Sequence, residues 1–478
     1  MNNLNVYEGE NSVLDFLNPE KGMIPPLVEI PDALNPYRKD GVRIYAKLMN
    51  MTPLGNVKSF PAVNMLHNLK DQKDVHTIVE NSSGNTVFSL AVVGRLLGIS
   101  NTKAFVSHEV SSGKLQLLRV LGIQPIINEE PICPDPEDKE SGIYKAKIKG
   151  KQKGWFNPGQ YDNKFNPQSH YKWTGPQIWE QTHGDIDVFC TGLGTTGTMV
   201  GIGSYLKEKN PRIKNIGVVR QPNNPVPGVR TSNLLTQIAF NWQGIVDATE
   251  EVGTVDSFKF SLELCRHGLL VGPSSGFALN GLLQYLAKAK HKNIRCVFIC
   301  ADSPLPYLNE YFEYLDETAF PTIENANLLI NKPNDTHQRV EKTNHLDWGI
   351  AVEDAFSKIY KEPKDRIWQL VKQNNEVHST DKIVLLDVRT PEEYLDAHAP
   401  NSINIDHITA LSKIKHLSES YKEKEVYVIC RSGKRSDLVT TALREEGITA
   451  YNINGGMIEW SQKNYPRWRP EICNTSLK

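Results

Sequence analysis

Three short segments rich in glycine, serine and threonine have the composition of anion-binding turns. They lie at residues 81–86 (NSSGNT), 191–198 (TGLGTTGT) and 272–276 (GPSSG), and each precedes a stretch with helical periodicity. A turn of this kind directs backbone N–H groups and the positive end of a helix towards one point, which suits a phosphate or a carboxylate. Each segment alone could equally serve close packing or helix capping. Single motifs therefore leave both interpretations open.

A cysteine-containing segment at residues 430–436 (CRSGKRS) has the features of a reactive-thiol loop. It follows an apolar run, EVYVI, and precedes a helical run, DLVTTALREEG. Backbone N–H groups and a helix N-terminus surround a cysteine at such a junction, and Arg431, Lys434 and Arg435 add positive charge. These effects favour the thiolate, which is the nucleophilic form of cysteine. The alternative is an inert buried cysteine, and the positive surroundings argue against it.

The elements that must position these segments follow from the hydrophobic pattern. From about residue 40 to about residue 320, short apolar runs alternate with helical patterns, as in a parallel sheet covered by helices. A polar stretch follows, and a second α/β pattern begins near residue 350 with the runs KIVLLDVR, EVYVIC and TAYNING. We therefore predict an N-terminal extension at 1–40, a first module of two α/β subdomains at 41–320, a linker at 321–350 and a second α/β module at 351–478.

The order of the motifs is more informative than any one of them. NVKSF, SSGNTV, GTTGT and SSGF occur in this order, and the series resembles the fold-type II pyridoxal-phosphate (PLP) family that contains cysteine synthase and cystathionine β-synthase. The stretch NPGQYDNKFNPQSHYKWTGPQIWEQTHGDID is also similar to that family's approach to its phosphate loop. The resemblance implies a two-domain α/β fold like that of tryptophan synthase β, with PLP as the cofactor and a homodimer as the assembly.

By that resemblance, each motif residue has an expected role. Lys58 forms the Schiff base with PLP, Asn85 bonds the ring hydroxyl, and Ser274 faces the pyridine nitrogen. Lys58 would need a pKa lowered by desolvation to act as a nucleophile and as a carrier of protons. The residues expected to bind the phosphate are Gly194, Thr195, Thr196, Gly197 and Thr198. Those expected at the substrate, chiefly at its α-carboxylate, are Ser82, Ser83, Gly84, Thr86 and Gln160.

The resemblance implies β-replacement on an activated serine, O-acetylserine or O-phosphoserine, with cysteine as the product. A serine at the pyridine nitrogen, in place of an aspartate, gives a mild electron sink suited to β-elimination. Cystathionine formation and cysteine desulfhydration stay open as alternatives, and so does a PLP-binding or partner-docking protein without turnover. The stretch NNPVPGVR at residues 223–230 resembles a region of the cysteine synthase B branch, whose members accept thiosulfate or a protein thiocarboxylate. A proline-rich loop with one surface arginine explains it equally well.

Four positions depart from the family pattern. Ser59 and Phe60 stand where the family has Asp and Arg after the lysine. Val87 replaces a glycine after the SGNT motif, and Thr196 replaces a glycine of the phosphate loop. The last two add a Cβ where glycine allows close backbone approach. We expect the departures to affect the choice of substrate more than cofactor binding, because Lys58 and both anion-binding motifs are intact.

The second module resembles rhodanese. The segments LLDVRTPEEYLDAHAPNSINI and INGGMIEW match that family on either side of CRSGKRS. The resemblance implies that Cys430 carries a persulfide, while Asp387 and Arg389 are structural. The loop residues expected to stabilise the extra sulfur are Arg431, Ser432, Gly433, Lys434 and Arg435. The two modules would then work on one sulfur path, in which the second module supplies or handles the sulfur that the first one uses.

Composition limits the other functional classes. The 54 basic and 55 acidic residues give a net charge of -1, so no strong field would attract nucleic acid or an anionic membrane. No run of about 18 apolar residues exists, and the first residues lack the pattern of a secretion signal. We therefore expect a cytoplasmic enzyme that acts on a small amino-acid substrate and a sulfur donor, without nucleic-acid or membrane partners.

The cysteines follow neither a disulfide nor a metal-site spacing. There are seven of them, an odd number, scattered along the chain, so we expect reduced thiols and no bound metal. Cys296 and Cys300 lie in the apolar run RCVFIC and are predicted to be core residues.

Overall fold

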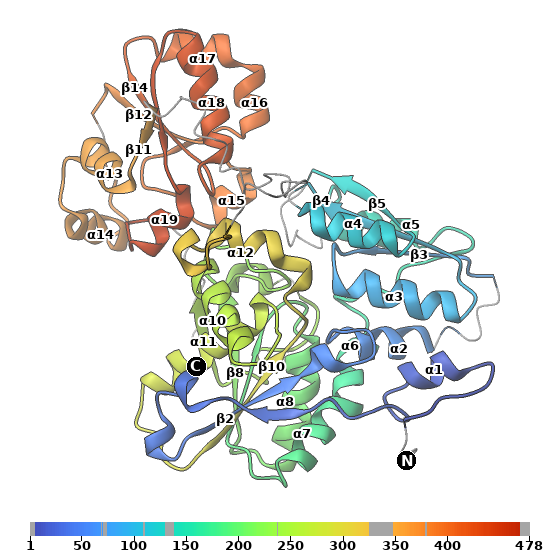
Figure 1. Ribbon diagram of the computed structural model, residues 1–478. Helices are drawn as coiled ribbons and strands as arrows, with labels where there is room; N and C mark the ends of the chain where they lie inside the picture. The colour runs from blue at the N-terminus through green and yellow to red at the C-terminus, as the bar shows by residue number, and fades with distance from the viewer. Residues whose placement is uncertain are drawn as a thin grey trace. The chain divides into compact units, whose positions relative to one another are not determined.

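The computed structural model describes residues 5–67, 69, 74–108, 110–129, 138–236, 238–324, 348–377 and 380–468 (Figure 1). The chain forms two compact units, residues 1–221 with 225–321, and residues 222–224 with 322–478. The predicted linker at 321–350 falls mostly outside the described residues, and so do Cys133 and Cys473. No helix within these ranges has the length and apolar character needed to cross a bilayer.

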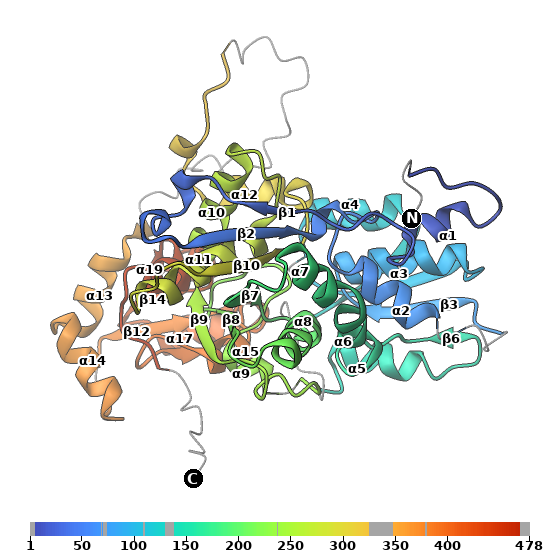
Figure 2. The same ribbon diagram turned by 90° about the horizontal axis from the view of Figure 1, so that it is seen from below.

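The first unit is built on a six-stranded sheet in the order β1-β2-β10-β7-β8-β9. The strands are β1 (Leu27–Glu29), β2 (Arg43–Leu48), β7 (Val188–Gly192), β8 (Lys214–Arg220), β9 (Ala248–Val252) and β10 (Arg295–Cys300). All neighbours are parallel except β1, which runs antiparallel to β2 along the edge (Figure 2). Strand β1 lies inside the segment that the sequence assigns to an N-terminal extension, so part of that segment belongs to the sheet.

A second, smaller sheet completes the first unit. Its four strands are all parallel, in the order β5-β4-β3-β6. They are β3 (Thr77–Asn81), β4 (Asn101–Ser107), β5 (Ile123–Asn128) and β6 (Trp155–Phe156). Two parallel sheets in one unit confirm the predicted fold class, and they place the ends of their strands where loops can face each other.

Helices cover both faces of the larger sheet (Figure 1). The helices of the first unit are α1 (Ser12–Leu17), α2 (Ser59–His67), α3 (Asn85–Leu96), α4 (Ser112–Val120), α5 (Gly142–Lys149), α6 (Phe165–Ser169), α7 (Gly175–Gln181), α8 (Gly197–Lys209), α9 (Ser232–Leu235), α10 (Thr254–Arg266), α11 (Pro273–Ala287) and α12 (Leu308–Tyr314). Alternate strand residues face opposite sides. Cys190 and Phe298 pack with α10 and α11, whereas Phe189 and Val297 pack with α7 and α8.

The second unit is a five-stranded parallel sheet in the order β11-β15-β14-β12-β13. Its strands are β11 (Gly349–Ile350), β12 (Ile383–Asp387), β13 (Ile403–Asn404), β14 (Glu425–Ile429) and β15 (Thr449–Ile453). Its helices are α13 (Val352–Tyr360), α14 (Lys364–Lys372), α15 (Pro391–Asp396), α16 (His407–Ser412), α17 (Ile414–Ser420), α18 (Lys434–Glu445) and α19 (Gly456–Gln462). Separate apolar cores lie on its two faces, one around Trp460 and one around Leu386.

Candidate active sites

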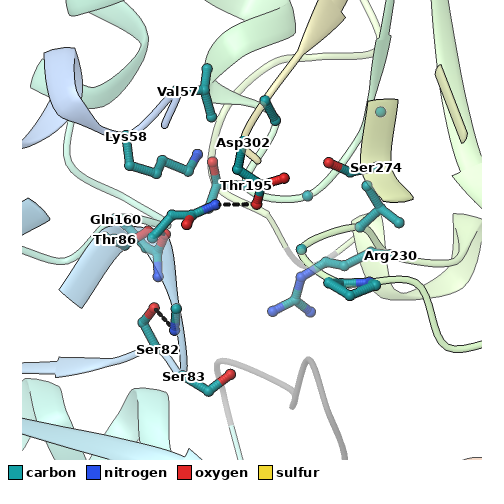
Figure 3. A pocket seen from close by; sticks show the side chains of 18 of the residues that line it. Val57, Lys58, Ser82, Ser83, Thr86, Gln160, Thr195, Arg230, Ser274 and Asp302 are labelled. Atoms are coloured by element: carbon teal, nitrogen blue, oxygen red, sulfur yellow. Dashed lines mark hydrogen bonds between the residues drawn. The ribbon is translucent and has the colours of Figure 1, made fainter. Parts of the chain in front are cut away.

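A cavity of about 200 Å³ lies in the first unit, where loops from the two sheets meet (Figure 3). A space for one water needs only roughly 10–15 Å³, so the cavity has room for a ligand much larger than a solvent molecule. The predicted residues that line it are Lys58, Ser82, Ser83, Gly84, Asn85, Thr86, Gln160, Gly194, Thr195, Thr196, Thr198 and Ser274. Gly197 is not among them, because it packs against Asn166. Three motifs that are far apart in the sequence therefore share one cavity.

Lys58 precedes helix α2 and extends its amine into the cavity (Figure 3). Its backbone N–H donates to Asn56 Oδ1 at 2.9 Å, which fixes the turn before the helix. The side chain is half-buried, and desolvation lowers the pKa of the amine to about 8. A minor fraction of this amine is therefore neutral near physiological pH, far more than for an ordinary lysine, and attack on an aldehyde requires the neutral form.

The two departures that follow Lys58 have structural roles. The Ser59 hydroxyl lies 2.8 Å from Thr52 Oγ1 and donates to the Asn56 carbonyl at 2.8 Å. Phe60 is buried and packs edge-on against Trp173, with ring centroids 5.8 Å apart. Both residues hold the turn that carries Lys58 and do not line the cavity.

The loop after β3 forms the side of the cavity opposite the larger sheet. Thr86 Oγ1 donates to Gln160 Oε1 at 2.6 Å, and Gln160 Nε2 donates to the Asn81 carbonyl at 3.1 Å. Ser82 Oγ accepts the Gly84 N–H at 3.2 Å, and both Ser82 and Ser83 lie at the cavity wall (Figure 3). Gln160 is thereby part of the same wall as the SSGN turn. Val87, the third departure, is fully buried in a small apolar cluster behind it.

Glu80 ties this loop to the segment that carries Gln160. Its carboxyl accepts N–H groups from Asn81 and Gly159 at 3.0 Å and from Gln160 at 3.4 Å. Burial raises the pKa of Glu80 to about 7, although these hydrogen bonds oppose the rise. The sequence analysis did not single out this carboxyl.

The turn before α8 fits a phosphate. Thr196 stands at the N-terminus of the 13-residue helix with φ of +63°, a left-handed conformation that β-branched residues rarely adopt. Its buried Oγ1 has no hydrogen-bond partner among the described residues, so a phosphate oxygen would satisfy it. A Cβ on Gly194 would lie 2.0 Å from the Gly228 carbonyl oxygen, which explains why that position needs glycine. The donors present therefore suit the phosphate of PLP.

His170 supports the same turn from behind. It lies on a π-helical segment, η4 (His170–Thr174), with Nε2 3.3 Å from Thr198 Oγ1 and Nδ1 2.9 Å from Thr174 Oγ1. Desolvation, with a contribution from the Lys58 charge, lowers the pKa of His170 to about 3. His170 is therefore neutral. His170 lies in the segment NPGQYDNKFNPQSHYKWTGPQIWEQTHGDID, but nothing in its sequence indicated a role for this histidine.

Ser274 and Arg230 approach the cavity from the wall opposite Lys58 (Figure 3). Ser274 lies in the first turn of α11. Arg230 is only 1% exposed, and its guanidinium lies 5.0 Å from the centre of the Tyr161 ring. The interpretation of Arg230 as a surface arginine is therefore wrong, because the loop folds inwards over the phosphate turn.

The cavity is also lined by residues that the sequence patterns did not indicate, among them Asp302, Tyr307 and Lys114. Asp302 follows the carboxyl end of β10, Tyr307 ends the 3₁₀ turn η5 (Leu305–Tyr307), and Lys114 lies on α4. The position of Asp302 just beyond a parallel strand is a signal that could have found it. Lys114 and Tyr307 had no comparable signal.

In the second unit, Cys430 lies between β14 and α18 and is 1% exposed. The Gly433 N–H donates to Cys430 Sγ at 3.2 Å, and Ser436 Oγ lies 3.3 Å from it. Gly433 has φ of +96°, which lets the loop turn back over the sulfur. A Cβ on Gly456 would lie 2.4 Å from the Cys430 carbonyl oxygen, so α19 approaches the loop closely.

Arg435 is held by a carboxylate. Two of its nitrogens donate to the Glu393 carboxylate at 2.7 and 2.8 Å. Burial alone would raise the pKa of Glu393, but the hydrogen bonds and charge of Arg435 lower it to about 2. Glu393 also closes the capping box of α15 with Thr390. This pairing holds Arg435 beside the start of α18, and its expected role at the persulfide stays a prediction.

Asp387, Arg389 and the core cysteines lie in the interior of the two units. Asp387 and Arg389 form a buried ion pair, with Arg389 Nη2 2.6 Å from Asp387 Oδ2. Cys296 and Cys300 are buried in β10, and burial raises the pKa of both thiols, as expected of core cysteines. The five cysteines in the described part of the chain form no disulfide. Within the same residues, no group of three or more metal-binding side chains gathers.

Comparisons with known proteins match both units. A family model described as pyridoxal-phosphate dependent enzyme matches residues 25–302, and one described as rhodanese-like domain matches residues 369–463. The chain is 32% identical over 283 residues to a cysteine synthase of Aquifex aeolicus, covering 56% of this chain and 84% of the relative. It is 29% identical over 271 residues to cysteine synthase B of Escherichia coli, covering 55% and 85%.

Two other similarities add related activities. An O-acetylserine dependent cystathionine beta-synthase of Bacillus subtilis is 31% identical over 273 residues, covering 54% of this chain and 86% of the relative. The crystal structure of a hydrogen sulfide-producing enzyme from Fusobacterium nucleatum superposes with a TM-score of 0.52 at 25% identity, covering 59% of this chain and 95% of that one.

Proposed function

This chain belongs to the family of pyridoxal-phosphate dependent enzymes, and we propose that its first unit performs β-replacement on an activated serine to make cysteine. The rhodanese-like domain would supply or handle the sulfur as a persulfide on Cys430. The observation that carries the proposal is one cavity in which the low-pKa amine of Lys58 faces two separate anion-binding turns. One turn suits the cofactor phosphate and the other suits the carboxylate of an amino acid.

The residues that would hold PLP are Lys58, Asn85, Ser274 and the turn at 194–198. When bound, PLP supplies the electron sink that makes the substrate α-proton acidic and permits loss of the β-substituent. Lys58 would attach the cofactor and later take the α-proton on Nζ, because its amine is neutral in part at physiological pH. Neutral His170 lies near Thr198 Oγ1 and adds no charge behind the phosphate turn.

The amino-acid carboxylate would be bound at the N-terminus of α3. Ser82, Ser83 and Gly84 precede this helix, and free N–H groups at a helix start favour an anion. Gln160 and Thr86 would fix the shape of this turn through their mutual hydrogen bond.

Two cations favour a second anionic group on the substrate or on the sulfur donor. Lys114 and Arg230 line the same cavity as Ser82 and Ser83. A phosphate leaving group on serine, or thiosulfate as the donor, would carry the negative charge that these side chains attract. We therefore expect O-phosphoserine to be used at least as well as O-acetylserine.

Cys430 would transfer sulfur by a thiolate displacement. Its sulfur attacks the outer sulfur of thiosulfate, a new S–S bond forms, and the old S–S bond breaks so that sulfite leaves with the electron pair. A thiol reductant would then have to supply two electrons to release the outer persulfide sulfur as sulfide, and this sulfide would be the nucleophile that adds to the β-carbon of the amino acid. The Gly433 N–H, which already donates to Cys430 Sγ, would stabilise the charge on the sulfur. A fused donor site is present at about millimolar effective concentration when the linker is short and flexible.

The test is product analysis with four amino acids. Purified protein with PLP receives serine, O-acetylserine, O-phosphoserine or cysteine, together with sulfide or with thiosulfate and a thiol reductant, and the products are identified by mass spectrometry. We expect cysteine from the activated serines, loss of this product in Lys58→Ala, and retention in Lys103→Ala, a lysine on β4 outside the cavity. Absence of any β-replacement in the wild type would end the proposal.

The same experiment addresses the alternatives. The Bacillus subtilis relative makes cystathionine formation the second candidate, so homocysteine is added as a competing nucleophile. Release of sulfide from cysteine would indicate desulfhydration. Replacing Cys430 by serine should abolish thiosulfate-dependent cysteine formation and spare the sulfide-dependent reaction. If Cys430→Ser leaves both reactions unchanged, transfer of sulfur from the second unit is rejected.

Homodimerisation stays a prediction that light scattering would check.

A further inference from the structure

Asp302 lines the cavity, but neither the sequence motifs nor the proposed reaction gives it a role. It follows β10, is 3% exposed, and lines the same cavity as Lys58 and Ser274. Its Oδ2 accepts two short hydrogen bonds, from Asn85 Nδ2 at 2.6 Å and from the Tyr307 hydroxyl at 2.6 Å. Asn85 is the residue expected to meet the ring hydroxyl of PLP. Asp302 therefore fixes the amide that contacts the cofactor.

The other carboxyl oxygen is not paired. Asp302 Oδ1 is buried and has no hydrogen-bond partner within the part of the chain that the structure describes. It lies against Gly272, where a Cβ would come within 2.3 Å of it, two residues before Ser274. Because both lone pairs of Oδ2 are engaged, a proton on this carboxyl would reside on Oδ1.

Burial and hydrogen bonding act on this group in opposite directions. Desolvation raises the pKa of Asp302, whereas the bonds from Tyr307 and Asn85 and the charge of Lys114 lower it, and the net shift is upward. Lys114 is also close to Tyr307, with its Nζ 4.7 Å from the ring centre. The titratable or charged groups that surround the carboxyl are Lys58 before α2, Lys114 on α4, Cys300 on β10, Tyr307 on η5, and Glu310 and Tyr311 on α12.

We propose that Asp302 is a positioning residue that anchors the Asn85 amide and, by gaining or losing a proton, sets the proton affinity of the cofactor held beside it. This inference rests on the proposed cofactor site and goes beyond its motif residues. A structural role alone would need only an acceptor for Asn85 and Tyr307, and an asparagine provides that without the cost of burying a carboxylate. The carboxyl adds ionisation, which asparagine lacks.

The experiment compares variants that separate anchoring from ionisation. Asp302→Asn keeps an acceptor of the same shape, and Asp302→Leu removes it. Tyr307→Phe removes one donor, and Tyr311→Phe is the matched control, because the Tyr311 hydroxyl meets Ser261 and not Asp302. Each full-length protein is stripped of PLP, checked for folding by circular dichroism, and titrated with PLP by fluorescence. The loaded protein is then titrated with acid and base while its visible absorbance is followed.

We expect Asp302→Asn to bind PLP within about threefold of the wild type. The pH midpoint of its visible band should fall by about one unit, because a nearby anion favours the protonated form of the cofactor. Asp302→Leu should bind PLP about tenfold more weakly, the effect of losing a hydrogen bond to a charged group. Tyr307→Phe should also lower the midpoint, but by less than Asp302→Asn, because the carboxylate loses a donor that favours its ionised form, and Tyr311→Phe should leave it unchanged.

A pH titration of Asp302→Asn and Tyr307→Phe that superimposes on the wild type would overturn the inference. These two variants decide the matter even if Asp302→Leu does not fold. Failure of the cofactor assignment looks different: the wild type would then bind no PLP and show no visible band that depends on Lys58.

Discussion

At the scale of single residues, desolvation of the Lys58 amine lowers the stability of the folded protein. Its pKa of about 8 lies below the ordinary 10.5, so the unfolded chain binds this proton more tightly than the folded protein does. Folding is therefore penalised at pH 7, and the penalty fades as the pH rises from about 8 to 10.5.

Replacing Lys58 by methionine should therefore stabilise the cofactor-free protein while it abolishes covalent cofactor binding. We expect a gain on the order of 1–3 kcal/mol in the free energy of unfolding at pH 7, and little gain above pH 10.5. Urea unfolding of both proteins at the two pH values measures it. Equal stability at both pH values would show that the amine is not desolvated.

Thr196 is a second residue of the cavity in an unfavourable state, here a strained backbone conformation. A β-branched side chain at φ of +63° costs about 1–2 kcal/mol, and glycine adopts this conformation without strain. Thr196→Gly should raise the stability of the cofactor-free protein by about 1 kcal/mol and weaken PLP binding severalfold, because the unpaired hydroxyl is lost. Thr195→Gly, a change at a position without positive φ, should instead destabilise the cofactor-free protein. Chemical unfolding and PLP titration of both variants test this.

The motifs that the sequence singled out each lie in one loop. Local composition left the NSSGNT, TGLGTTGT and GPSSG segments open between packing and anion binding; the structure brings residues of all three to one cavity with Lys58, and their individual roles stay predictions. Asp302, Tyr307 and Lys114 were missed, because their contribution depends on which loops become neighbours in space. Arg230 could not be placed from sequence, since a proline-rich loop gives no indication of whether it folds inwards.

At the scale of elements, Glu80 links strand β3 to the segment that carries Gln160. Its pKa of about 7 exceeds the ordinary 4.5, so the folded protein holds this proton more tightly than the unfolded chain. The stabilising contribution is complete below about pH 4.5 and is lost as the pH rises through about 7.

Glu80→Gln should remove this pH dependence. Relative to the variant, the wild type should lose on the order of 1–3 kcal/mol of unfolding free energy between pH 4.5 and 7. Glu317→Gln, at an exposed position on the 3₁₀ turn η6 (Glu317–Ala319), is the control. Unfolding curves across this pH range provide the measurement, and parallel curves for wild type and Glu80→Gln would contradict the assignment.

The alternation of strands and helices was largely predictable, because parallel strands buried on both faces have continuous apolar sequences. Examples are VFCTG in β7 and RCVFIC in β10. Strand β1 was not predicted. It is three residues long and at the sheet edge, and its pairing with β2 depends on contacts that a short sequence window does not contain. The π-helical turn at His170 was not predicted for a similar reason.

At the scale of the whole molecule, the two units have separate apolar cores. Calorimetry should therefore show two unfolding transitions, and PLP should raise the midpoint of only one, because a ligand stabilises the unit that binds it. Leu386→Ala, in a fully buried position of β12, should reduce the free energy of unfolding of the second unit by about 2–5 kcal/mol and lower the midpoint of the other transition. One transition that shifts as a whole would show that the units are thermodynamically coupled.

Because Gly456 closely approaches the Cys430 carbonyl, a substitution at Gly456 would allow the proposed sulfur transfer by the second unit to be disturbed without changing the first unit. Any larger side chain at this position, where φ is +55°, must push the thiol loop out of place while every reactive atom of the protein is kept. The Gly456→Val variant could be used in a genetic test. A strain that carries it should grow with sulfide as the sulfur source and fail to grow with thiosulfate, if the cell depends on the fused donor domain. Such a strain would show what the fusion contributes to the organism while Cys430 itself stays in the chain.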